Sequence, residues 1–178
     1  MNHLITQAHP STKSLCHMLA QRIASSDRMS GGCIDVAELY DTSLNPILSD
    51  VDIAMTGWEP FGSDIRTEQN KIDRADTVTF IAPIWWGGLP AILKGYFDRV
   101  FRNGFAYDNT NGKTQGLLTN KKFLFILTTQ EKESYLRTNG SLEAITRLIK
   151  NGIPEACGVT QSDIYFLFGQ SELYDSTR

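Results

Sequence analysis

Three short polar segments of this sequence contain groups suited to binding a planar, phosphorylated molecule. The first, residues 9–14, reads HPSTKS and leads into a helical pattern. Hydroxyls and main-chain N–H groups at the start of a helix attract anions, so this segment predicts a phosphate site. A plain helix cap by Ser11 or Ser14 is an equally good interpretation. The sequence contains neither GxGxxG nor GxxxxGK[ST], which argues against Rossmann and P-loop nucleotide sites.

The second segment, residues 83–90, reads PIWWGGLP and joins two tryptophans to two glycines. Glycines let a flat ring approach the main chain closely, and indoles offer ring faces and N–H donors. We expect one tryptophan to face a ligand and the other to be a core or dimer-interface residue. The third segment, residues 128–131, reads TTQE, and its hydroxyls and amide suit the polar edge of a ring. The charges of Glu131, Lys132 and Glu133 are expected to be solvated.

A parallel sheet is the scaffold that the surrounding apolar runs predict. Residues 77–82, 123–127 and 164–168 are nearly continuous apolar runs, typical of strands buried on both faces, and 3–7 and 33–39 are weaker strand candidates. Helical spacing predicts helices over 15–23 and 92–101, and a third from a Ser141 cap to Gly152 just past its end.

Alternating strands and helices predict an α/β fold: a flavodoxin-like, doubly wound, five-stranded parallel sheet of order 2-1-3-4-5 in a single domain, residues 1–178. Ligands of such sheets bind at the carboxyl ends of the strands, where the three polar segments would meet. Residues 41–65 are predicted to be a long loop. Little sequence remains for a helix after the last strand.

Composition excludes several classes of protein. The net charge of −3 gives no sign of a nucleic-acid-binding face, and no apolar stretch is long enough for a membrane span. The N-terminus does not resemble a secretory signal, so we expect a cytoplasmic protein. Cys16, Cys33 and Cys157 form no metal or disulfide pattern, and Cys16 is predicted to be a small core residue. Asp98 and Arg99 are predicted to form a salt-bridging or interface pair.

The most distinctive stretch, PIWWGGLPAILKG followed by FDRVF and GFAY, resembles the flavodoxin-like NAD(P)H:quinone oxidoreductase family. His9-Pro10 with Ser14, and the stretch LNPILS at 44–49, support the same resemblance. The family implies a homodimer that binds a flavin, FMN or FAD. Hydride passes from NAD(P)H to the flavin and then, in a second step, to a quinone-like acceptor. The aromatic stretch Tyr96–Tyr107 would offer apolar surface for the dimer.

The resemblance also implies roles for individual residues. Tyr135 is the expected catalytic residue, since it would help with the charge that develops on the ring during reduction. The expected cofactor-binding residues are His9, Lys13, Ser14, Leu15 and Cys16 at the phosphate and ribityl chain, Pro83, Ile84, Trp86 and Gly87 along the ring, and Thr128, Thr129 and Gln130 at the polar edge of the ring. No metal site is expected.

The sequence departs from the family at several of these positions. The family's usual Thr-Thr-Gly-Gly motif is replaced by TTQE at residues 128–131, and its usual asparagine in the first helix by Cys16. Many members have a histidine shortly after the tyrosine, but here Arg137 or Asn139 stands in that region. We therefore expect slower quinone reduction than in typical relatives. Two other functions remain open: a regulatory flavoprotein subunit of a potassium efflux system, and a flavodoxin-type electron carrier. The weak net charge argues against the carrier, because such proteins are usually strongly acidic.

Overall fold

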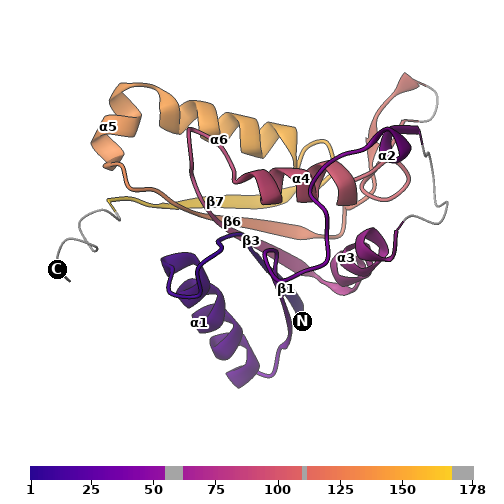
Figure 1. Cartoon of the computed structure of the whole chain (residues 1–178), viewed down its shortest axis with the longest axis horizontal. Helices are drawn as coiled ribbons and strands as arrows, with labels where there is room; N and C mark the ends of the chain where they lie inside the picture. Colours follow the sequence, from indigo (N-terminus) through magenta and orange to yellow (C-terminus); the bar gives the residue numbers. More distant parts are fainter. Residues whose placement is uncertain (55–61, 110–111, 170–178) are drawn as a thin grey trace.

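A five-stranded parallel sheet forms the centre of the computed structural model, which describes residues 1–54, 62–109 and 112–169 (Figure 1). Its strands are β1 (Asn2–Gln7), β2 (Cys33–Glu38), β3 (Thr77–Pro83), β6 (Lys122–Thr128) and β7 (Gln161–Leu167). They lie in the order β2-β1-β3-β6-β7, which confirms the predicted order 2-1-3-4-5. Strands β4 (Tyr107–Asp108) and β5 (Gln115–Gly116) form a separate small antiparallel pair.

The register of the sheet aligns the carboxyl ends of its strands. Gln7 of β1 pairs with Ile81 of β3, and Pro83 pairs with Thr128 of β6. The main chain continues this alignment beyond the strands, because Ala8 N donates to Ile81 O and Ile84 N donates to Thr128 O. The three polar segments therefore leave the sheet at the same edge.

Helices cover both faces of the sheet. Helices α3 (Ser63–Arg74), α4 (Ala91–Val100) and α6 (Ser141–Gly152) pack on one face around Phe80, whose ring is fully buried. Helix α1 (Leu15–Met29) packs on the opposite face, where Cys16 is 1% exposed, as expected of a small core residue (Figure 1). The remaining helices, α2 (Asp50–Ala54) and α5 (Glu133–Thr138), are short, and α5 contacts α6 (Figure 1).

The prediction of a long loop over 41–65 is wrong in part, since the segment contains α2 and the start of α3. Helix α3 does not show the apolar spacing of a typical helix, because its buried residues include Glu68 and Gln69 as well as two isoleucines. Lys71 Nζ lies 2.7 Å from Glu68 Oε1, and Gln69 Nε2 donates to Val100 O at 3.0 Å. These partners pair one carboxylate oxygen of Glu68 and the amide nitrogen of Gln69 inside the core.

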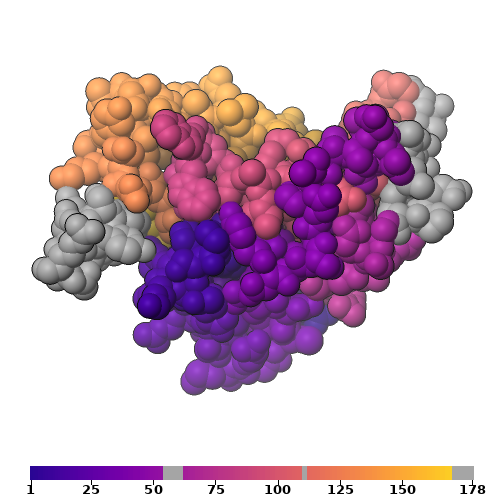
Figure 2. All heavy atoms as spheres, in the orientation of Figure 1, coloured from indigo at the N-terminus to yellow at the C-terminus, as the bar shows by residue number. Residues whose placement is uncertain are grey.

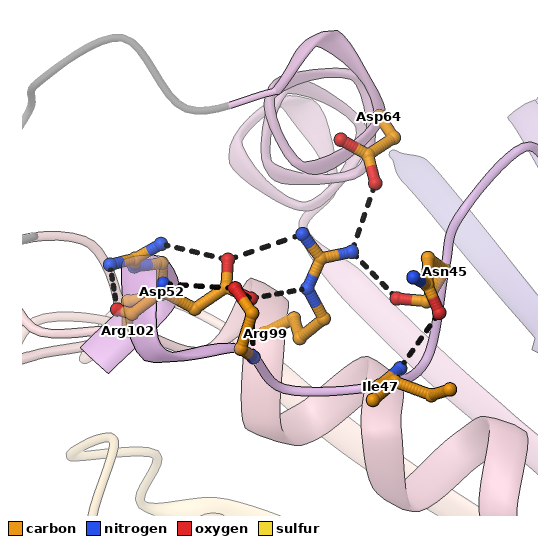
Figure 3. A network of polar contacts seen from close by, with 7 residues as sticks. Asn45, Ile47, Asp52, Asp64, Arg99 and Arg102 are labelled. Atoms are coloured by element: carbon orange, nitrogen blue, oxygen red, sulfur yellow. Dashed lines mark hydrogen bonds and ion pairs between the residues drawn. The ribbon is translucent and has the colours of Figure 1, made fainter. Parts of the chain in front are cut away.

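Arg99 fastens the segment after β2 to helices α3 and α4 (Figure 3). Its guanidinium donates to both carboxylate oxygens of Asp52 at 3.1 Å and to Asp64 Oδ2 at 3.0 Å. It also donates to the main-chain oxygen of Asn45 at 2.6 Å. The salt bridges predicted at 98–99 are therefore present, but the two residues do not pair, since Asp98 lies against Lys94.

Close packing at Gly95 completes this junction. A Cβ atom added to Gly95 would lie 2.1 Å from the main-chain oxygen of Pro46, so only glycine lets the segment lie on α4. The Arg99–Asp52 contact is strongly ionic: hydrogen bonds from Arg99 and Ser49 hold the pKa of Asp52 at about 2, against the effect of its burial.

Three predictions are wrong, one about the aromatic stretch and two about the ends of α6. Tyr96, Phe97 and Phe101 are 0%, 7% and 8% exposed, so these aromatic side chains of the stretch Tyr96–Tyr107 fill the core rather than offer a dimer surface. Ser141 is the first residue of α6 and not its cap, which is Gly140 with φ 78°. Gly152 is the last residue of α6 rather than the residue after it. The chain after β7 from residue 170 onward lies outside the described residues.

Candidate active site

A cavity of about 850 Å³ opens where β1, β3 and β6 end. In Figure 2 the segment after β1, in indigo, lies next to the pink segment after β3, with the orange α5 beside them. All of the predicted site residues except Lys13 line this cavity: His9, Ser14, Leu15, Cys16, Pro83, Ile84, Trp86, Gly87, Thr128, Thr129, Gln130 and Tyr135. The fold thus brings together residues that are more than 120 positions apart in the sequence.

The segment after β1 presents donors to the cavity. Ser14 is the N-cap of α1 and accepts a hydrogen bond from His17 N at 3.1 Å. Leu15 and Cys16 stand in the first turn, where main-chain N–H groups have no partner within the helix. Burial lowers the pKa of His9, and its Nδ1 accepts from Ser11 N at 3.0 Å. The neutral ring therefore carries its proton on Nε2 as a further donor.

The segment after β3 is a tight two-residue turn. Trp85 and Gly88 exchange main-chain hydrogen bonds of 3.0 Å in both directions, and Trp86 and Gly87 between them have φ angles of 52° and 73°. Among the described non-glycine residues, Trp86 alone has a positive φ. This conformation is unfavourable for a residue that has a Cβ atom. The side chain of Trp86 is fully exposed, so the turn holds an open indole face at the rim of the cavity.

The other tryptophan also lies at the cavity. Trp85 is 42% exposed, and its ring meets the ring of His9 edge-on with centroids 5.5 Å apart. The expectation that one tryptophan is a core residue is therefore wrong for both. A position in a dimer interface stays a prediction.

The segment after β6 forms the floor of the cavity. Thr128 and Thr129 are 6% and 5% exposed. The hydroxyl of Thr128 lies 3.4 Å from the thiol of Cys16, which joins the floor to α1. Burial raises the pKa of Cys16, so the thiol stays neutral and is a poor nucleophile.

Several lining residues are absent from the predicted set: Trp85, Glu131, Leu136, Asn139, Ser141 and Ile145. Asn139 lies one helical turn beyond Tyr135, so their spacing of four residues was the available signal. Arg137 points elsewhere and pairs with Glu133, which leaves Asn139 as the residue at the cavity. Across the described residues, histidine, cysteine, aspartate and glutamate side chains form no group that could hold a metal ion. No helix in the same residues is long and apolar enough to cross a membrane.

Comparison with known proteins gives matches over nearly the whole chain. A family model described as a flavodoxin-like fold matches residues 1–177. The chain is 36% identical to a Haemophilus influenzae protein named as an NAD(P)H oxidoreductase, over 98% of this chain and 87% of the relative. It is 34% identical to the human ribosyldihydronicotinamide dehydrogenase [quinone], over 87% of this chain and 76% of the relative.

A solved structure agrees with these sequence matches. The NAD(P)H:quinone oxidoreductase from Methanothermobacter marburgensis superposes with a TM-score of 0.82 and 28% identity. The match covers 95% of this chain and 84% of that protein.

Proposed function

The chain belongs to the flavodoxin-like family whose model spans residues 1–177, its relatives make it an NAD(P)H oxidoreductase, and we propose that it works as one domain through a bound flavin. In this proposal hydride passes from NAD(P)H to the flavin and then to a quinone-like acceptor, in two separate steps. The observation that carries the proposal is the cavity, which gathers three segments with complementary chemistry.

The cavity suits a flavin in size and in donors. Its volume of about 850 Å³ lies within the usual range for cofactor sites. The first turn of α1 and the Nε2–H of His9 would hold the phosphate. The turn at Trp86 and Gly87 would lie along the ring, and Thr128, Thr129 and Gln130 would meet its polar edge. The same groups suit FMN and the flavin half of FAD.

A bound flavin would supply the hydride chemistry, and the chain's own residues would position it and its substrates. Tyr135 is 58% exposed at the cavity, so its hydroxyl can donate a hydrogen bond to a ring edge and remain reachable by solvent protons. The buried hydroxyls of Thr128 and Thr129 add fixed dipoles beneath that edge. In this proposal donor and acceptor would occupy the same cavity in turn.

We also propose that the protein is a cytoplasmic homodimer. The segment fastened by Arg99 exposes the apolar side chains of Ile47, Leu48, Val51 and Ile53, which are 43–71% exposed. Apolar surface on a firmly held segment is typical of a protein–protein contact. Light scattering at micromolar concentration tests the dimer, and a monomer would refute it.

The visible spectrum of the purified protein and the identity of its extracted cofactor test the flavin. We expect flavin absorbance, release of FMN or FAD on denaturation, and steady-state turnover of NADPH with menadione. A colourless protein that cannot be reconstituted with either flavin would refute the proposal. Flavin without turnover would instead favour a regulatory flavoprotein subunit or an electron carrier.

A further inference from the structure

The described residues that line the cavity include an acidic side chain but no lysine or arginine. Four of these residues can ionise: His9, Cys16, Glu131 and Tyr135. Burial lowers the pKa of His9 and raises that of Cys16, so both are neutral near pH 7. No described lysine or arginine lines the cavity. The carboxylate of Glu131 is therefore the one formal charge among the described lining residues.

The main chain fixes Glu131 at this place. Its N–H donates to Thr129 Oγ1 at 3.2 Å, and its C=O accepts from Gly169 N at 3.0 Å. Thr129 is buried in the cavity floor, so the main chain of Glu131 is held next to the residues that we expect at the polar edge of the ring. Tyr135, four residues further on, lines the same cavity.

The neighbouring charges do not share this position. Glu133 lines a different cavity, of about 740 Å³, between α6 and β7, and its carboxylate pairs there with Arg137. Lys132 lines neither cavity. The three consecutive charged residues 131–133 are all exposed, as the sequence predicted, and Glu131 alone among them also lines the cavity at the sheet edge.

We propose that Glu131 makes the site select its acceptor by charge, favouring uncharged or cationic quinone-like compounds over anionic ones. This inference rests on the proposed function, because it describes the acceptor of the same cavity. An anionic group about 6 Å from a carboxylate is disfavoured roughly 3-fold at the dielectric constant of water and about 100-fold at an effective value of 20. Because Glu131 lies in a part of the cavity that is open to solvent, we expect the discrimination against an anionic acceptor to lie near the lower limit, at roughly 3- to 20-fold.

The test compares Glu131→Gln with the matched control Glu133→Gln, which removes the same charge two residues away. Two acceptors of similar shape serve as probes, neutral menadione and the anionic 1,4-naphthoquinone-2-sulfonate. We expect Glu131→Gln to raise the sulfonate-to-menadione ratio of kcat/KM roughly 3- to 20-fold, and Glu133→Gln to leave the ratio unchanged. The gain should shrink in 0.5 M salt, which screens exposed charges.

Binding of the sulfonate in the absence of NAD(P)H gives a second measurement that does not depend on turnover. Quenching of tryptophan fluorescence should report a Kd that Glu131→Gln lowers by the same factor, since Trp85 and Trp86 line the cavity. Equal ratios and equal Kd values in the wild type and Glu131→Gln would overturn the inference. An equal gain in Glu133→Gln would also overturn it, because the effect would then belong to surface charge in general. Absence of menadione turnover in the wild type would count against the proposed function instead.

Discussion

We predict that the positive φ of Trp86 lowers the stability of the protein, whereas its indole strengthens flavin binding. Replacing Trp86 should therefore raise the stability and weaken flavin binding. Its φ of 52° puts a residue with a Cβ atom in the left-handed region, at a cost of about 1 kcal/mol relative to residues that tolerate it. Its side chain is fully exposed, so shortening it removes little packing. Asparagine adopts this conformation readily, and it is common in tight turns of this kind.

We therefore expect Trp86→Asn to raise the free energy of unfolding of the flavin-free protein by about 1 kcal/mol. For a chain of this size that corresponds to a rise in Tm of roughly 2–4 °C. The same change should weaken flavin binding by about 1 kcal/mol, roughly fivefold in Kd, because a ring contact is lost. Urea denaturation without flavin and fluorescence titration with flavin measure the two effects.

Trp85→Ala provides the control, because Trp85 is half-buried against His9 and does not have a positive φ. It should lower the stability rather than raise it. A Trp86→Asn protein that is less stable than the wild type without flavin would refute the reasoning, since the strain would then be absent or offset by contacts of the indole.

Three further changes test other parts of the structure. Asp52→Asn should lower the free energy of unfolding by about 2 kcal/mol at pH 7. The depressed pKa stabilises the fold above pH 4, so this difference should narrow as the pH falls from 4 towards 2; a difference independent of pH in urea titrations would contradict it. Gly95→Ala should cost about 1–3 kcal/mol by pushing Pro46 away, and an unchanged Tm would argue against that contact. Tyr135→Phe should slow reduction by NAD(P)H in stopped-flow traces without releasing flavin, and an unchanged rate would remove Tyr135 from the chemistry.

The central strand β3 could be predicted because it is buried on both faces, which leaves a continuous apolar run. Strand β6 has a similar run, but its side chains alternate between buried and half-buried. Helix α3 could not be predicted, because its buried face includes the polar residues Glu68 and Gln69. Glu68 pairs with Lys71 of the same helix, and Gln69 donates to the distant main-chain oxygen of Val100. Most of the cavity is formed by residues at the carboxyl ends of the strands, so these residues could be predicted once the strands were identified in the sequence.

The rest of the cavity depends on turns whose geometry the sequence does not specify. Glu131 lines the cavity, where its main chain is held by Thr129 and Gly169, whereas Glu133 lines the separate cavity beside α6 and β7. The aromatic residues around Tyr96 gave no indication of which side they bury, because a broad apolar stripe suits a core and an interface equally.

The strand order also determines how the protein can assemble during synthesis. After β1 and β2 have paired, each later strand joins the same growing edge, first β3, then β6 and finally β7. No finished pair has to open to admit a later strand, so the amino-terminal part of the sheet can form while the ribosome is still extending the chain. The cavity is different, because its lining runs from His9 to Ile145 on α6. A nascent chain can therefore hold the complete cavity only after α6 has been made.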